Sequence, residues 1–234
     1  LGLGYCNLGS LLMHMGIPYD DERGYAICGA LTSIMCGESY ATSAEMSSVL
    51  GPFPNYSENA DHMLRVMRNH RRAAYDAPAE EYEGLTVAPV GINSKKCPKD
   101  LLEAARAAWD RALREGGEHG FRNAQTTVIA PTGTIGLVMG ADTTGVEPQF
   151  SLVQYKQLAG GGSLRIINHG VPNALRRLGY SDKETEVIQE YIMGTASLRN
   201  CPTLLLASLL LKPHKTPTRK RKMSAAGTDR DDVA

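Results

Sequence analysis

A short turn of small polar residues is the part of this 234-residue chain best suited to chemistry. It reads Pro-Thr-Gly-Thr-Ile and follows a run of β-branched and apolar residues. Pro131 fixes one backbone angle, and Gly133 permits conformations that are closed to other residues. Backbone N–H groups concentrated in such a turn bind phosphate oxygens without a lysine or arginine, and threonine hydroxyls can add to them. We therefore predict a phosphate-binding loop that consists of Pro131, Thr132, Gly133, Thr134 and Ile135.

Other interpretations of this turn compete with phosphate binding. Proline, threonine and glycine are common turn residues, so an isolated Pro-Thr-Gly-Thr sequence would favour an ordinary tight turn. A P-loop is disfavoured because the pattern GxxxxGK[ST] is absent. A second turn, ADTTGVEP, follows at residues 141–148, so the surrounding sequence has to decide between these interpretations.

The cysteines and histidines do not predict a metal site. The five cysteines are scattered without a CxxC pair, which is typical of a reducing compartment, and we expect a cytoplasmic location. The histidines do not share metal-ligand spacing with cysteines or carboxylates. The cysteines are Cys6, Cys28, Cys36, Cys97 and Cys201, and the histidines before the tail are His14, His62, His70, His119 and His169.

Hydrophobic periodicity predicts three helices before the turn. The first spans residues 20–50 and is stopped by the sequence GPFP at Gly51 and Pro52. The second reads SENADHMLRVMRNHRRAAY, and the third reads DLLEAARAAWDRALREGG, with Gly116 and Gly117 at its end. In the second helix we expect Met63, Val66, Met67, His70 and Ala74 to face inward, and Arg65, Arg68 and Arg72 to face outward. Arginines here could contact nucleotide phosphates, but a solvated helix face is the more common role.

Shorter elements surround and follow the turn. AQTTVIAP predicts a buried strand, and SLVQYKQLA is a second candidate strand that periodicity does not separate from a helix. VPNALRRLGY predicts a helix with Pro172 near its start and Gly179 past its end. SDKETEVIQEYI predicts another helix, capped by Ser181 and Glu184. Helices that lead into buried strands indicate an α/β architecture.

Several motifs in the chain resemble those of the adenosylcobalamin-dependent (class II) ribonucleotide reductases. The segment RNAQTTVIAPTGTIGLVMGADTTGVEPQFSLVQYKQLAGGG is similar to the C-terminal part of their catalytic barrel. Upstream, the resemblance includes LGLGYCNLGSLLMHMGIPYD, ALTSIMCGESYATSAEM, LGPFPNYSENADHMLRVMRNHRRAAYD and APVGI. It implies a helix-rich α/β fold in which residues 1–198 form part of a ten-stranded α/β barrel.

The resemblance also implies a function. A ribonucleoside-diphosphate reductase of this kind reduces ribonucleotides to deoxyribonucleotides by radical chemistry, for DNA synthesis. The turn from Pro131 to Ile135 would hold the substrate's phosphates. The intact enzyme would use adenosylcobalamin as cofactor and a thiol reductant such as thioredoxin, and it could form a homodimer. Basic and acidic residues number 25 each, so we expect neither nucleic acid nor a membrane as a partner.

The residues that carry the radical step are not expected in this chain. The family's Asn-x-Cys-x-Glu motif is absent, and Cys6 matches a later segment in which alanine is more usual. Gly140 and Ala141 stand where the family has an acidic residue and a cysteine. We therefore expect no catalytic residue here and no activity from the chain alone. The alternative is a noncatalytic remnant, or a nucleotide-binding module, with the same fold.

The tail, residues 199–234, departs from the family pattern. It begins with an apolar run too short to span a bilayer and continues with the basic sequence KPHKTPTRKRK. We expect it to be disordered, as the product of a reading-frame change or a truncated gene. The alternative is an arm that binds nucleic acid or an anionic surface. The N-terminus lacks the basic region and cleavage site of a signal peptide.

Overall fold

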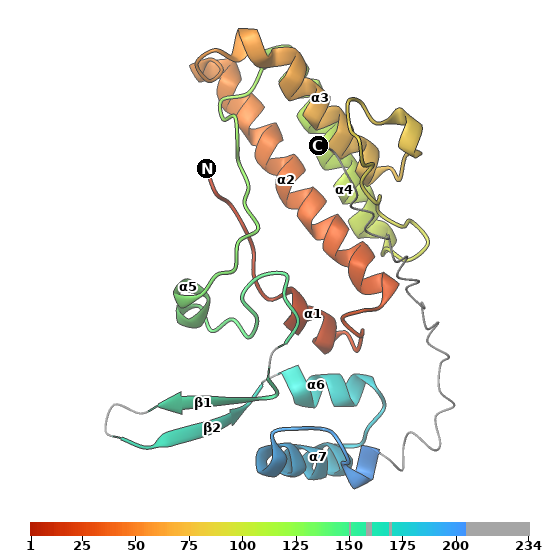
Figure 1. The fold of residues 1–234 in the computed structure, drawn as a ribbon, viewed down its shortest axis with the longest axis vertical. Coiled ribbons are helices and arrows are strands. Elements are labelled where there is room, and N and C mark those ends of the chain that lie inside the picture. Colours follow the sequence, from red (N-terminus) through yellow and green to blue (C-terminus); the bar gives the residue numbers. More distant parts are fainter. Residues whose placement is uncertain (150, 158–160, 169, 205–234) are drawn as a thin grey trace, which may run out of the picture.

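The computed structural model describes residues 1–149, 151–157, 161–168 and 170–204. Three long helices pack together at one end of the molecule (Figure 1). The short helix α1 (Leu8–His14) lies between this bundle and a second group, which is made of a β-hairpin and two helices. The three long helices are α2 (Glu22–Leu50), α3 (Tyr56–Ala74) and α4 (Lys99–His119).

Helix α2 confirms the prediction for residues 20–50. Asp21 caps its start by accepting the N–H of Arg23 at 2.8 Å, and Gly51, with a φ of 76°, ends it. Small residues let α2 and α4 approach closely, since a Cβ atom on Gly37 would lie 2.8 Å from the Cβ of Ala108. The contact between these two helices forms the main core of the bundle.

Trp109 lies at the centre of that core. Its side chain is 1% exposed, and its Nε1 donates to Ser33 Oγ at 2.8 Å. One face of the indole stacks on His70 of α3, with ring centroids 4.8 Å apart and planes 4° from parallel. Leu102 and Ala105, which precede Trp109 on the same helix, are also buried. The buried residues of this core are Ala30, Tyr40, Ala41, Ala44, Met67, Ala74, Ile92, Leu102, Ala105, Trp109, Ala112 and Phe121.

The polar face of α3 differs from the solvated surface we predicted. Arg68 and Arg72 both bind the carboxylate of Glu83, each with an N–O distance of 2.6 Å. Between them Asn69 is buried, donating to the Glu83 carbonyl and accepting the Glu83 N–H. Val66, predicted inward, is 44% exposed. The arginines therefore anchor the loop that contains the short helix η1 (Ala79–Glu81).

The end of α4 also differs from the prediction. The helix continues through Gly116 and Gly117 and ends at Gly120, which has a φ of 69°. Gly116 is buried because the ring of Phe121 folds back onto its Cα, where a Cβ atom would overlap the ring. The glycine at this position is required by packing rather than by a left-handed backbone.

The second group contains a hairpin and two helices. Strands β1 (Val153–Gln157) and β2 (Ser163–Ile167) pair antiparallel, with Val153 opposite Ile167. Helices α6 (Gly170–Arg177) and α7 (Asp182–Thr195) follow, and both had been predicted. Strand β1 falls in the segment whose pattern did not separate a strand from a helix. Ser181 and Glu184 form the predicted capping box, and Gly179 adopts a φ of 94° after α6. The buried residues of this group are Val153, Val171, Leu175, Ile188, Ile192 and Cys201.

The segment AQTTVIAP does not form the predicted strand. Among the described residues it makes one parallel bridge, between Thr127 and Leu3. Val128 and Ile129 are 50% and 40% exposed, so the segment is not covered on both faces as we expected. A parallel strand is stable only with neighbours that cover its edges and faces, and the described residues supply a single short neighbour. Of the strands expected from part of a ten-stranded barrel, the described part of the chain contains the antiparallel pair of β1 and β2.

Two further expectations concern membrane association and the tail. No helix in the described ranges is both long and apolar enough to cross a membrane. Of the tail, Cys201 is buried with the second group, and residues 205–234 lie outside the described residues.

Candidate functional site: two joined turns

The first turn is positioned by a short parallel pairing with the start of the chain. Leu3 donates its N–H to the carbonyl of Thr126 at 3.0 Å, and Val128 donates to the carbonyl of Leu3 at 2.8 Å. The terminal amino group of Leu1 donates to the carbonyl of Gln125, also at 3.0 Å. The backbone that leads into Pro131 is therefore held from one side by residues more than a hundred positions away.

The predicted phosphate-binding residues lie at the surface. Pro131, Gly133, Thr134 and Ile135 are exposed, and Thr132 is half-buried. Helix α5 (Thr134–Val138) begins inside the turn and lies apart from the helical bundle in Figure 1. Gly133 does not have a positive φ, and a Cβ atom there would meet nothing within 4 Å. Our expectation of an unusual backbone at Gly133 was therefore wrong. Because Gly133 has no side chain, there is open space beside the backbone at this position.

Thr132 joins the first turn to the second. Its hydroxyl donates to the carbonyl oxygen of Thr144 at 2.8 Å, and its backbone N–H donates to the same oxygen. Thr144 in turn lies within 3.5 Å of Glu147 through its own hydroxyl. Because both donors of Thr132 are already used, the hydroxyl that remains for a ligand in the first turn is that of Thr134.

Hydrogen bonds and backbone packing connect the second turn to the start of helix α1. Asn7 accepts the N–H of Thr143 through its side chain at 2.9 Å and donates its own N–H to the Thr143 carbonyl at 3.0 Å. Ser10 donates to the carboxylate of Asp142 at 3.2 Å. A Cβ atom on Gly9 would overlap the Glu147 carbonyl, so α1 and the turn pack backbone to backbone.

Sequence reasoning missed the role of Asn7 and Ser10. Both belong to the sequence CNLGS, which we considered only for Cys6. Asn7 has a φ of 72°, a left-handed conformation that asparagine adopts more readily than most residues. An asparagine placed directly before a short helix was thus a signal of special backbone geometry.

The buried hydroxyl of Thr143 has no such support. Thr143 belongs to the second turn and is fully buried, yet its Oγ1 has no hydrogen-bond partner among the described residues. Leaving a buried hydroxyl unpaired costs about 1–3 kcal/mol. The second turn is therefore held by its backbone and not by this side chain.

The cysteines have the environment of structural residues. All five are free, and Cys36 lies 3.1 Å from the hydroxyl of Thr127. Burial raises the pKa of Cys36 and that of Cys97, so both thiols are protonated at neutral pH and are weak nucleophiles. Among the described residues, no group of histidines, cysteines and carboxylates could hold a metal ion.

Comparison with known proteins identifies the family. A model of the barrel domain of ribonucleotide reductase matches residues 1–208. The chain is 57% identical over 213 residues to a vitamin B12-dependent ribonucleotide reductase of Bradyrhizobium diazoefficiens, and 58% identical over 213 residues to that of Agrobacterium fabrum. Each alignment covers 91% of this chain.

A more distant relative has a related name. A vitamin B12-dependent ribonucleoside-diphosphate reductase of Mycobacterium tuberculosis is 24% identical over 166 residues, which are 71% of this chain and 16% of that protein. The chain spans only 17% of the length of the Bradyrhizobium and Agrobacterium relatives. The motifs around the two turns fall within the matched residues, and the chain therefore belongs to the ribonucleotide reductase barrel family.

Proposed function

We propose that this chain forms the substrate phosphate-binding part of a vitamin B12-dependent ribonucleotide reductase. The observation that carries the proposal is the exposed turn from Pro131 to Ile135. It is held by the pairing of Leu3 with the segment before it and by the hydrogen bond from Thr132 to Thr144. In this role the turn would hold the phosphates of a ribonucleotide while the ribose is reduced. Its task is positioning, and no bond is made or broken by its residues.

The geometry assigns different tasks to the two threonines of the turn. Thr132 is a positioning residue, because its hydroxyl and N–H bind the second turn. Thr134 would contact the ligand through its exposed hydroxyl, together with backbone N–H groups of the turn. Gly133 would allow phosphate to approach the backbone closely, since nothing lies within 4 Å of the place a Cβ atom would take.

The reaction itself would need groups beyond those described. Cobalamin would supply the radical chemistry in the intact enzyme, and we assign none of the described residues to hold it. A thiol reductant such as thioredoxin, a homodimeric state and a cytoplasmic location belong to the same proposal. So does the division into a barrel part, residues 1–198, and a separate tail, residues 199–234.

The substrate role can be tested on the chain itself by titration with a ribonucleoside diphosphate, observed by ³¹P NMR. Gly133→Val should weaken binding by roughly ten- to a hundredfold, because the new side chain blocks phosphate from the turn's donors. Thr134→Ser is the matched control, since it keeps the hydroxyl and should bind like the parent. Valine meets open space at Gly133, so the variant should fold normally. If Gly133→Val binds like the parent, the turn is an ordinary turn.

A noncatalytic remnant, or a nucleotide-binding module, with the same fold is the second candidate. A chimera separates the two candidates: residues 1–208 replace the matching segment of the Bradyrhizobium relative. Production of deoxyribonucleotide would support a barrel segment competent for catalysis. A chimera that folds and binds nucleotide without turnover would favour the noncatalytic module. The chain alone should produce no deoxyribonucleotide in either case.

A further inference from the structure

We propose a second anion-binding site, in a cavity between α1 and α6, which takes a small molecule that carries a phosphate group. The cavity has a volume of about 390 Å³. Four polar side chains line it, one from α1 and three from α6: His14, Asn173, Arg176 and Arg177. None of the residues of the turn from Pro131 to Ile135 is among them.

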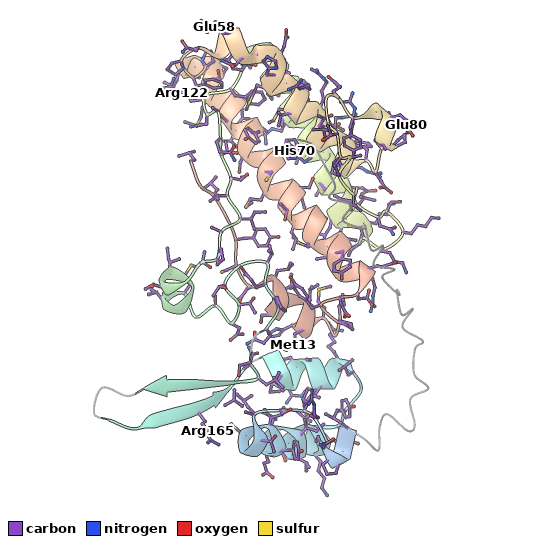
Figure 2. The ribbon with its side chains drawn as sticks, viewed as in Figure 1. Met13, Glu58, His70, Glu80, Arg122 and Arg165 are labelled. Carbon is purple, nitrogen blue, oxygen red and sulfur yellow. The ribbon has the colours of Figure 1, made fainter. Side chains whose placement is uncertain are left out.

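The two helices that form the cavity are packed closely against each other. A Cβ atom on Gly170, the first residue of α6, would lie 2.6 Å from Met13 Cε and 2.8 Å from His14 Cε1. Met13 is labelled in Figure 2, where it lies at the side of α1 that faces α6. At the other end, a Cβ atom on Gly16 would lie 3.3 Å from the Cβ of Arg177. The lining residues are therefore held by backbone packing rather than by loops.

The imidazole of His14 is oriented by its own helix. Its Nδ1 lies 2.8 Å from the carbonyl oxygen of Ser10, and a carbonyl can only accept a hydrogen bond. Nδ1 therefore carries a hydrogen. In the neutral ring Nε2 is then an acceptor, so it can contact only a protonated oxygen of a phosphate group. The same Ser10 donates to Asp142, which fixes the position of this turn of α1.

The guanidinium groups of Arg176 and Arg177 differ in their partners. Arg176 binds Asp182 through Nε at 2.9 Å and lies 3.3 Å from Asn173 Oδ1 through Nη1. Asn173 accepts through its oxygen and thus retains its amide N–H₂. Arg177 has no carboxylate partner in the part of the chain that the structure describes. Two guanidinium groups and one carboxylate leave the cavity with net positive charge.

The chemistry of this lining selects the ligand class. Guanidinium and amide N–H groups are donors, and together they suit a group with several acceptor oxygens and negative charge. Arginine binds phosphate or carboxylate through two parallel N–H bonds, and phosphate has oxygens enough for both arginines and the amide. Asn173, Arg176 and Arg177 are exposed, so the cavity is open to solvent and a phosphate group could enter it directly.

The site can be tested with inorganic phosphate and pyrophosphate as probes, following the backbone amide signals of the full chain by NMR. We expect saturable shifts in α1 and α6, with pyrophosphate binding more tightly than phosphate. Arg177→Ala should weaken both by roughly ten- to a hundredfold, because one charged partner is lost. His14→Gln should change binding little, because the Nδ1 hydrogen of His14 is already used by the carbonyl of Ser10. Arg177 is exposed, so melting temperature should not change.

Two controls make the outcome decisive. Arg114→Ala removes another exposed guanidinium, on α4, and should leave binding unchanged. Gly133→Val should also leave it unchanged, which separates this site from the proposed substrate loop. Equal shifts with chloride at the same ionic strength would overturn the proposal, as would unaltered phosphate binding by Arg177→Ala.

Discussion

The Thr132 hydroxyl donates to the carbonyl oxygen of Thr144 at 2.8 Å, which joins two turns that are separate in the sequence. The oxygen also accepts the Thr132 N–H, so one acceptor holds two donors of the same residue. The first turn faces solvent, and the second rests on α1 through Asn7. The position of the exposed turn thus depends on a helix near the start of the chain.

Removing the Thr132 hydroxyl should loosen this connection. Thr132→Val should lower the free energy of unfolding by about 0.5–1.5 kcal/mol, the usual contribution of one hydrogen bond. Amide exchange in residues 142–145 should become faster, because one of the two donors to Thr144 is lost. Denaturant unfolding and hydrogen exchange measure the two effects.

Thr143→Val is the matched control for that prediction. It makes the same chemical change in a neighbouring threonine whose buried hydroxyl has no partner among the described residues. Removing this hydroxyl should raise the free energy of unfolding by about 1 kcal/mol. If both valine variants change stability in the same direction, the hydrogen bond between the turns is not what stabilises them.

Gly116 and Gly117 of α4 should respond oppositely to alanine. Gly117→Ala adds a methyl group where nothing lies within 4 Å and should stabilise the helix by up to about 1 kcal/mol. Gly116→Ala places a methyl group against the ring of Phe121 and should destabilise the protein by about 1–3 kcal/mol. Thermal unfolding of both variants tests the prediction, and a stabilised Gly116→Ala would show that Phe121 does not pack as described.

The Glu83 carboxylate should make stability depend on acid. Hydrogen bonds from Arg68 and then Arg72 lower its pKa from 4.5 to about 2. A carboxylate with a lowered pKa stabilises the folded state above its ordinary value, and this contribution is lost as pH falls through the folded pKa. Melting temperature should therefore fall between about pH 4.5 and pH 2.

Glu83→Gln should weaken that acid dependence and lower stability at neutral pH. Glu103→Gln is the control, because Glu103 is an exposed carboxylate of α4 that lies 3.6 Å from Lys99. Its melting curve should follow that of the parent from pH 7 to pH 2. An unchanged acid dependence in Glu83→Gln would locate the titrating group elsewhere.

Trp109 and Ser33 should be energetically coupled. Trp109→Ala should cost about 3–5 kcal/mol, because a large side chain that is 1% exposed leaves a cavity. Trp109→Phe keeps the ring but leaves Ser33 without its donor. A double-mutant cycle of Trp109→Phe and Ser33→Ala should give a coupling of about 0.5–1.5 kcal/mol. A coupling of zero would mean that the bond contributes nothing to stability.

The helices could be predicted because their signals are local. The period of apolar residues, the GPFP stop and the capping box of Ser181 lie within a few positions of the elements they define. Gly116 was misread because its reason lies in the return of Phe121, which no local pattern shows. The arginines of α3 were misread similarly, since their partner Glu83 belongs to a loop.

The candidate site was predicted only in part. Composition and resemblance selected Pro131 to Ile135. The hydrogen bond from Thr132 to Thr144 could not be predicted, because it depends on how the two turns meet in space. The strand before the turn failed because its pattern describes a covered strand, whereas Val128 is half exposed here. Its apolar residues predict burial against neighbours, and a sequence pattern does not say which chain segment provides them.

The pairing of Leu3 with Thr127 has a consequence for the order of folding. Contacts within and between neighbouring helices form early, because little chain entropy is lost in closing short loops. The hydrogen bond from Leu3 to the carbonyl of Thr126 joins residues more than a hundred positions apart and should form late. The turn at Pro131 then acquires its shape only in molecules whose helices have already packed. The slowest phase of refolding should therefore be seen in signals from this turn.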